Sequence, residues 1–328
     1  MNLSDQPLPS RRRLPVSARR RRAIGASCLA FLLLCLLALN ACGTPASSNG
    51  STSAGKVLNV VATVNFWGSI ARQLGGVHVA VISVVTSPTG DPHNYEPTTS
   101  DARAIATADY VIENGAGYDG WADKLMSANP SPGRKVLTAA QVVGENIPGY
   151  NPHIWYNPDY VEKISSAITA DYQALDPADA TYFTRQHAAF EHAVQPYRRV
   201  IAAIKAKYAG VPVGASESIC IFLAQATGLN LITPLAYMKA ENDGTDPPAA
   251  SVAEFNQQIV QHQIKVFLLN VQTISNATRS LQASLAQSGI PVVEISETIR
   301  PVNATFEQWQ LNQLQALQKA LAQAVPNA

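Results

Sequence analysis

Residues 86–97 of the chain read Thr86-Ser87-Pro88-Thr89-Gly90-Asp91-Pro92-His93-Asn94-Tyr95-Glu96-Pro97. They follow an apolar, β-branched run at 77–85 and precede a helix-like segment at 100–108. This order predicts that His93 lies in a loop at the carboxyl end of a strand, where open α/β sheets bind ligands. Three prolines and one glycine restrict the loop, and this lowers the entropy lost when an imidazole is fixed towards a ligand.

A second loop repeats the arrangement. It reads Asn151-Pro152-His153-Ile154-Trp155-Tyr156-Asn157-Pro158 and again places a Pro-His step between turn residues and a helix. Two such loops in one chain favour a ligand-binding role for His93 and His153 over an incidental one.

Strand and helix patterns alternate in two parts of the chain. Because the strands are nearly continuous runs of Val, Ile and Ala between helices, each part is predicted to be an α/β lobe with a mostly parallel sheet covered on both faces. The first part has predicted strands at 57–64, 77–85, 110–113 and 135–138 and helices at 67–74, 100–107 and 120–127. The second has predicted strands at 211–216, 229–233, 266–270 and 291–296 and helices at 219–227, 249–262, 275–287 and 305–324.

A long helix is predicted between the two lobes. Asp176-Pro177 provides a helix start, and no glycine follows until Gly210. A helix over 177–208 would be on the order of 45 Å long, with a kink or a break at Pro196. The predicted organisation is a signal peptide at 1–41, a flexible tether at 42–55, a first lobe at 56–172, a linking helix at 173–209 and a second lobe at 210–328.

The amino terminus indicates export. A basic segment precedes an apolar stretch at 23–39 and the sequence Leu39-Asn40-Ala41-Cys42, and the stretch is shorter than the roughly 20 residues of a membrane-spanning helix. The pattern resembles a bacterial lipobox with Cys42 as the lipidated residue. The alternative is an uncleaved anchor helix, and in both cases the folded part is expected outside the cytoplasm, anchored to the cell membrane.

Charge and cysteine content narrow the function. From Cys42 onward, 17 basic residues face 22 acidic ones, a formal net charge of −5. This excess argues against a nucleic acid partner and mildly favours cations. Only Cys220 falls in the predicted fold, so an internal disulfide is excluded there, and the residue is interpreted as a small buried apolar side chain.

Candidate acidic ligands follow strands of the second lobe. Glu217 follows the strand at 211–216, and Glu297 follows the strand at 291–296. Glu297 is interpreted as the first position after that strand at which a carboxylate can leave a sheet with two apolar faces. The acids of the loop 241–248 are interpreted as solvated charges, and His187 and His192 as surface residues.

Several motifs together resemble a known family, the metal-binding lipoproteins of bacterial ABC importers for zinc and manganese, the cluster A-I solute-binding proteins. The residues that carry the resemblance are Gly90-Asp91-Pro92-His93, Tyr95-Glu96-Pro97, Ala108-Asp109, Asn114-Gly115, Asn151-Pro152-His153-Ile154-Trp155, Glu217 ahead of Phe222-Leu223-Ala224-Gln225-Ala226-Thr227-Gly228-Leu229, and Gly289-Ile290-Pro291-Val292-Val293.

The resemblance implies a protein that captures a metal ion and catalyses no reaction. The first three metal ligands of the family fall on His93, His153 and Glu217. The fourth falls on Ser296, but serine is a poor ligand for a divalent ion, so Glu297 is preferred. Ser296 and the acids of 241–246 remain the alternatives.

The cargo implied is a divalent transition metal, zinc or manganese. Imidazoles suit zinc, while carboxylates admit the harder manganese. The absence of histidine from residues 128–150 tilts the choice slightly towards manganese or a broader specificity. The partners implied are a membrane permease of an ABC importer and the membrane itself through the lipid anchor, with the binding protein expected to be a monomer.

Two other classes compete with this interpretation. A zinc hydrolase would need an open coordination position for water and a nearby general base, but no His-Glu-x-x-His run or Gly-x-Ser-x-Gly elbow occurs in the sequence. A binding protein for an organic ligand, or an adhesin, would use aromatic residues such as Trp67, Tyr95, Trp155 and Tyr156 to line a cleft. That class leaves the paired histidine loops unexplained.

Overall fold

The computed structural model describes residues 56–147 and 149–327. The predicted signal peptide, Cys42 and the predicted tether lie outside these residues. Within the described ranges, no helix has both the length and the apolar character needed to cross a membrane.

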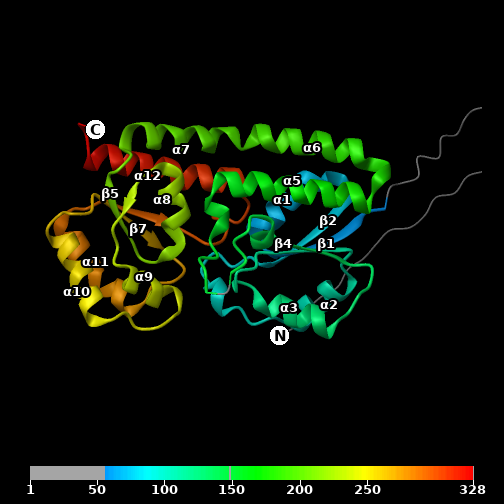
Figure 1. The fold of residues 1–328 in the computed structure, drawn as a ribbon, viewed down its shortest axis with the longest axis horizontal. Helices are drawn as coiled ribbons and strands as arrows, with labels where there is room; N and C mark the ends of the chain where they lie inside the picture. The colour runs from blue at the N-terminus through cyan, green and yellow to red at the C-terminus, as the bar shows by residue number, and fades with distance from the viewer. Residues whose placement is uncertain (1–55, 148, 328) are drawn as a thin grey trace, which may run out of the picture. The chain divides into compact units, whose positions relative to one another are not determined.

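The first lobe contains a four-stranded parallel sheet in the order β2-β1-β3-β4. Helices α1 and α5 lie on one side of this sheet, and α2 and α3 lie on the other (Figure 1). Its elements are β1 (Leu58–Val64), α1 (Asn65–Gly75), β2 (Val79–Val85), α2 (Thr99–Thr107), β3 (Tyr110–Glu113), α3 (Gly120–Ala128), β4 (Lys135–Thr138), α4 (Ala139–Val142) and α5 (Pro158–Leu175).

The second lobe repeats this strand order as β6-β5-β7-β8, again all parallel. In both sheets the order reverses between the first and third strands, which creates the crevice where α/β proteins bind ligands. Its elements are β5 (Pro212–Ala215), α8 (Ile221–Thr227), β6 (Asn230–Leu231), α9 (Leu235–Asn242), α10 (Ala249–Val260), β7 (Val266–Asn270), α11 (Asn276–Ser288), β8 (Val292–Ile295) and α12 (Phe306–Ala324).

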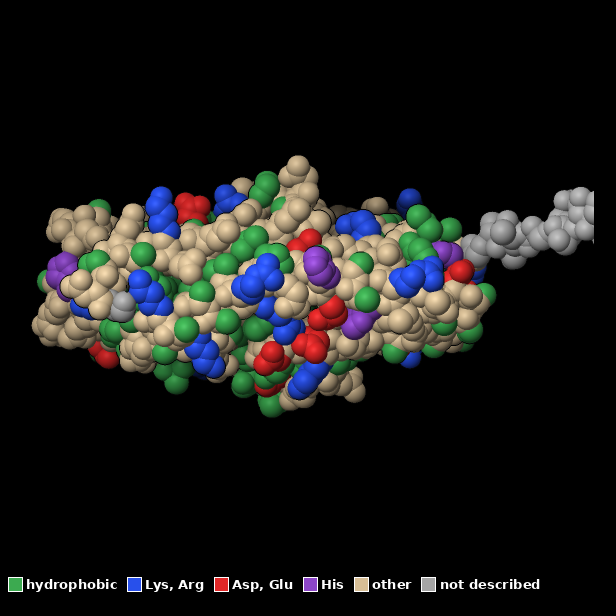
Figure 2. All heavy atoms as spheres, turned by 90° about the horizontal axis from the view of Figure 1, so that it is seen from above, with side chains coloured by type: hydrophobic (Ala, Val, Ile, Leu, Met, Phe, Trp, Pro, Cys, Tyr) green, Lys and Arg blue, Asp and Glu red, His purple; other side chains and the backbone are tan. Residues whose placement is uncertain are grey.

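The helix expected between the lobes is broken near Pro196, one of the two outcomes predicted for this proline. Helix α6 (Ala180–Ala193) is followed after one residue by α7 (Gln195–Tyr208). Pro196 lacks an amide hydrogen and its ring clashes with the carbonyl four residues earlier, so the helix breaks here. The two helices run along the same side of both sheets, α6 over the first and α7 over the second (Figure 1). From this side, Lys and Arg are scattered along the surface, and Asp and Glu gather near its middle (Figure 2).

A shared core joins the two lobes. Phe66, at the start of α1, stacks on Trp155 with ring centroids 4.2 Å apart and faces Trp309 of α12 at 6.3 Å. All three side chains are buried, and they belong to one apolar cluster that includes strands of both sheets. Burial of aromatic surface on this scale is a major favourable term in folding, so the two sheets are held together by packing as well as by the chain.

Local sequence signals explain where several helices begin and end. Thr98 and Asp101 form a reciprocal capping box at the start of α2, and Asn157 caps α5 ahead of Pro158. Gly228 and Gly289 end α8 and α11 in the left-handed conformation, which glycine adopts without a steric penalty.

The strand β8 differs from its interpretation as a strand with two apolar faces. It is the edge strand of its sheet, and its residues alternate between exposed and buried, with Val292 and Glu294 exposed. A carboxylate therefore already leaves the sheet at Glu294. One face of β8 is exposed because β8 lies at the edge of its sheet, and the sequence pattern did not reveal this position.

Candidate metal centre

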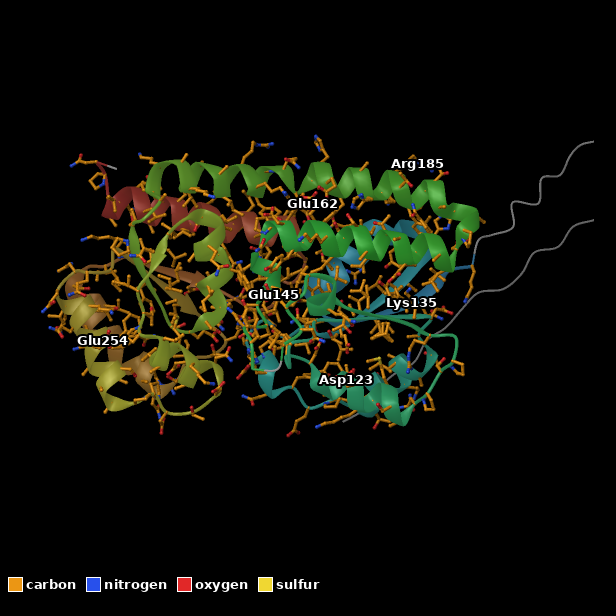
Figure 3. The ribbon with its side chains drawn as sticks, viewed as in Figure 1. Asp123, Lys135, Glu145, Glu162, Arg185 and Glu254 are labelled. Atoms are coloured by element: carbon orange, nitrogen blue, oxygen red, sulfur yellow. The ribbon has the colours of Figure 1, made fainter. Side chains whose placement is uncertain are left out.

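Two histidines and two glutamates from four separate loops meet between the lobes. His93 and His153 come from the first lobe, and Glu217 and Glu297 come from the second. One ligand atom from each lies within 4.8 Å of those of the other three. Figure 3 shows side chains crowded around Glu145, where the loops of the two lobes approach each other.

His93 lies in a short 3-10 turn, Pro92–Asn94, shortly after β2. Asp91 fixes this turn, because its carboxylate accepts the His93 amide at 2.9 Å and the Asn94 side-chain amide at 2.7 Å. The His93 ring packs edge-on against Tyr118. Its side chain is 21% exposed, whereas those of His153 and Glu297 are fully buried. His93 is therefore the member of the cluster that faces solvent.

Asn151 fixes the tautomer of His153. Asn151 Oδ1 accepts the His153 backbone N–H at 3.0 Å, so this atom is the amide oxygen, and it lies 2.6 Å from His153 Nδ1. Because an oxygen of this kind only accepts, Nδ1 carries the hydrogen and Nε2 presents a lone pair towards the cluster. An imidazole held by its other nitrogen in this way is typical of metal ligands.

Asn270, the last residue of β7, holds the two glutamates together. Its Nδ2 donates to Oε1 of Glu217 and, at 2.7 Å, to Oε1 of Glu297. Glu217 Oε1 also accepts the Thr273 hydroxyl, and Glu297 Oε2 accepts the Tyr118 hydroxyl at 2.8 Å. Glu297 Oε2 lies 3.2 Å from His93 Nε2 and 3.8 Å from His153 Nε2.

Three buried polar atoms of the cluster have no hydrogen-bond partner. They are His93 Nε2, His153 Nε2 and Glu217 Oε2. Buried polar groups without partners are rare in folded proteins because each loses its hydration without compensation. Together with Glu297 Oε2, which lies 3.2 Å from His93 Nε2, these atoms form a compact set of nitrogen and oxygen donors of the kind that binds divalent cations.

The charges of the cluster interact strongly. Burial and the negative charge of Glu297 raise the pKa of Glu217 to about 8. Burial alone would raise the pKa of Glu297, but its interactions with His93 and His153 together outweigh burial and hold this pKa below its usual range. Burial lowers the pKa of His153. The two carboxylates thus titrate far apart, as expected for like charges in one buried site.

Neither alternative for the fourth position lies in the cluster. The Ser296 hydroxyl donates to the Thr298 carbonyl at 2.8 Å and accepts the Trp309 indole N–H at 3.0 Å. Glu241 accepts hydroxyl hydrogens from Ser275 and Thr278, and Asp243 pairs with Lys239 at 2.7 Å.

The loop 241–246 instead borders the way into the site. A cavity of about 450 Å³ is lined by Asp91, His93 and Glu217 together with Glu241, Asp243 and Asp246. The first two residues of the loop belong to the end of α9, a helix that the sequence interpretation did not include. An acidic cavity that reaches His93 and Glu217 attracts cations towards the cluster.

Other candidate residues lie elsewhere. Cys220 is fully buried among apolar residues, which confirms its interpretation. His187 and His192 lie on α6, half-buried and exposed respectively. Trp67, Trp155 and Tyr156 are at most 2% exposed and belong to the shared core. These three side chains do not line a cleft, so they give no support to a site for an organic ligand. Tyr95 is partly buried, and its hydroxyl donates to Asp101 at 2.7 Å.

Sequence reasoning missed the residues that support the four candidates. Asn270 ends β7, which lies in the sheet between the strands that precede Glu217 and Glu297, so a polar residue at that strand end was a usable signal. Asn151 opens the second Pro-His loop, so it too stood in a stretch that the sequence singled out. For Tyr118 and Gln272, the sequence holds no comparable signal, because their role depends on how far each side chain reaches.

The protein has two α/β lobes with a buried set of imidazoles and carboxylates between them. These features define a class of protein, the two-lobed binding proteins with a cluster of candidate metal ligands between the lobes. The chain belongs to the family described as zinc-uptake complex component A, periplasmic (ZnuA), which matches residues 60–320.

Individual relatives are similar over different lengths. The high-affinity zinc uptake system protein ZnuA of Bacillus subtilis is 24% identical, over 78% of this chain and 84% of its own. The manganese-binding lipoprotein MntA of Halalkalibacterium halodurans is 29% identical over 50% of this chain, and the match spans about half, 54%, of that relative. The solute-binding protein FpvC of Pseudomonas aeruginosa, solved with Mn²⁺, has a TM-score of 0.68 at 22% identity, over 82% of this chain and 99% of its own. This likeness confirms the two-lobed α/β fold.

Proposed function

We propose that the protein is an extracytoplasmic solute-binding lipoprotein that captures one divalent transition-metal ion in the cleft between its lobes and delivers it to an ABC importer. The observation that carries the proposal is the convergence of three buried, unpartnered donor atoms from His93, His153 and Glu217 beside the Glu297 carboxylate. The relatives named as zinc and manganese binding proteins support it.

The four side chains would form an N₂O₂ ligand set. Each histidine contributes Nε2 as a neutral imidazole, and each glutamate contributes an oxygen. Two imidazoles admit zinc, two carboxylates admit manganese, and the affinity order of N/O sites favours zinc of the two. The protein supplies binding and selection here, and a fully protein-ligated ion leaves no position for a reacting water.

The position of His93 indicates how the ion enters the site, and the origin of the ligands in both lobes indicates how it leaves. The ion enters through the acidic cavity, meets His93 at the solvent side and displaces the protons of the cluster. Because the ligands come from both lobes, separating the lobes divides the set and weakens the site. An importer that opens the cleft would thereby release the ion.

The remaining features of the proposal concern the rest of the chain. Cys42 would carry the lipid anchor after removal of residues 1–41, and residues 42–55 would tether the protein to the membrane. The protein would act as a monomer with a permease as partner. Its working units would be residues 56–172 and 210–328, joined by residues 173–209.

The test uses mass action on stability. An ion that binds only the folded state at about one hundred times its dissociation constant adds roughly 2.7 kcal/mol to the free energy of unfolding. Calorimetric melting with zinc, with manganese and with a chelator should therefore show higher melting temperatures with metal. A melting temperature that no metal and no chelator changes would contradict the proposal.

A further inference from the structure

Gln272 joins the two loops that carry His93 and Glu297. It lies two residues after the end of β7 and is 7% exposed. Its Oε1 accepts the backbone N–H groups of Glu297 at 2.8 Å and Thr298 at 3.0 Å. Because two N–H donors converge on Oε1, the orientation of the amide is fixed and Nε2 must face the other side.

On that other side Nε2 reaches the first lobe. It donates to the Gly90 carbonyl at 2.8 Å and lies 3.3 Å from the Ser87 carbonyl. The buried Thr298 hydroxyl, 3.0 Å from Nε2, donates to the same Ser87 carbonyl at 2.8 Å. Gly90 lies three residues before His93 in the chain. One neutral side chain therefore ties the backbone before one candidate ligand to the backbone of another.

We propose that Gln272 is a positioning residue that fastens the His93 loop to the Glu297 loop and thereby slows release of the bound ion. This inference rests on the proposed function, since it concerns how that site is held closed. We call the contacts of Gln272 and Thr298 with Ser87 and Gly90 the interlobe clasp.

The clasp acts on release more than on capture. Separation of the lobes must break the bonds to Ser87 and Gly90 before His93 can move away from Glu297. Capture requires only that the ion reach an open site. The association rate therefore depends on how often ions diffuse in through the acidic cavity. Each hydrogen bond makes a modest net contribution because water replaces it on opening. Loss of the clasp should therefore raise the release rate about tenfold to hundredfold.

The test compares Gln272→Met with a matched control, Gln258→Met. Gln258 is 8% exposed and donates to the Ile232 carbonyl at 2.9 Å, entirely within the second lobe. In the purified protein, stopped-flow release of zinc to a chelator should be about tenfold to hundredfold faster for Gln272→Met, with an association rate within about threefold of the unchanged protein. Gln258→Met should change neither rate. Equal release rates in Gln272→Met and the unchanged protein would overturn the inference, as would an equal effect of both variants.

A second readout needs no metal and separates this inference from the proposed function. The amides of His93 and Asn94 are bonded to Asp91 within the first lobe, so removal of Gln272 deletes no bond of theirs. Their hydrogen exchange in the metal-free protein should nevertheless accelerate in Gln272→Met, and unchanged exchange would overturn the clasp. If the unchanged protein bound no metal, the proposed function would be wrong. The hydrogen-exchange measurement would still test the clasp, because it is made on the metal-free protein. Should Gln272→Met not fold, Gln272→Asn, which keeps the amide but is one methylene too short, takes its place in both measurements.

Discussion

Asn270 shows how single residues build the site from two like charges. Its one amide group donates to a carboxylate oxygen of Glu217 and of Glu297, which draws two acids into one buried space. Their other oxygens are thereby left on the side of the imidazoles. Repulsion between the acids is relieved by a proton in the metal-free protein and by the ion in the loaded one.

The first prediction at this scale concerns the fourth ligand. Glu297→Gln keeps the size of the side chain but removes its charge, so zinc affinity measured by calorimetric titration should fall about a hundredfold, or about 2.7 kcal/mol. Glu241→Gln is the matched control, because Glu241 lines the cavity that reaches His93 and Glu217 but lies outside the cluster. An intact affinity in Glu297→Gln together with a large loss in Glu241→Gln would assign the fourth ligand to the 241–246 loop.

The second prediction at this scale concerns pH. Burial lowers the pKa of His93, but the carboxylates of Glu297, Glu217 and Asp91 together outweigh burial and raise it to about 9. Burial and the charge of Glu297 raise the pKa of Glu217 to about 8. Below these values both groups hold protons that the ion must displace, so affinity falls as the pH is lowered. The expected loss approaches about a hundredfold per pH unit below pH 8. Chelator competition at pH 6, 7 and 8 measures it, and an affinity independent of pH would contradict this account.

The four candidate ligands were named from the sequence because each sits in a loop at a recognisable strand or helix boundary and because the family resemblance places ligands at three of them and beside the fourth. Glu217 and Glu297 follow β5 and β8, and the two histidines follow Pro in comparable loops. The clasp residue Gln272 could not be predicted, since its role depends on contacts with Ser87 and Gly90, more than 180 positions away in the chain.

At the scale of elements, three strands were predicted with the bounds that the structure has, whereas helix α9 was missed. The strands at 110–113, 135–138 and 266–270 agree with β3, β4 and β7 residue for residue, because buried parallel strands are short runs of β-branched and apolar residues. The strand predicted at 229–233 shortens to Asn230–Leu231, and α9 begins at Leu235. Tertiary packing of Tyr237 against Phe255 stabilises α9. The local sequence does not predict this helix, because the stabilising contact is with a residue outside it.

The end of β3 provides a prediction on stability. Burial raises the pKa of Glu113 to about 7, and the Thr138 hydroxyl on the neighbouring strand donates to this carboxyl at 2.6 Å. A raised carboxyl pKa means that the folded state loses stability as the pH rises from about 4.5 through 7. The loss is on the order of 3 kcal/mol. Glu113→Gln removes this charge, so it should be more stable than the unchanged protein at pH 8.

The comparison requires both pH values. Urea unfolding of the two proteins at pH 8 and pH 4.5, with chelator present, measures the difference, which should nearly vanish at pH 4.5 where Glu113 is protonated. A Glu113→Gln variant that is less stable than the unchanged protein at pH 8 would show that the ionised carboxylate is stabilising. The interpretation that burial raises the pKa of Glu113 would then be wrong.

At the scale of the whole folded part, the two sheets depend on one another. The core around Phe66, Trp155 and Trp309 draws residues from both lobes, and backbone and side-chain bonds such as Phe306 N–H to Ser69 Oγ at 3.0 Å add to it. The lobes should therefore unfold in a single cooperative transition. Urea unfolding followed by tryptophan fluorescence and by far-UV circular dichroism should give coincident curves, and two separated transitions would indicate independent lobes.

The central claim is that His93 and His153 bind one metal ion from the first lobe's side of the cleft. Its most direct measurement is the metal content of the purified protein, by mass spectrometry after dialysis against zinc or manganese, with His93→Ala and His153→Ala beside it. His187→Ala on α6 is the matched control, because that histidine lies outside the cluster. The account predicts one ion per chain in the unchanged protein and in His187→Ala, and far less than one in the other two. One ion per chain in both His93→Ala and His153→Ala would contradict it.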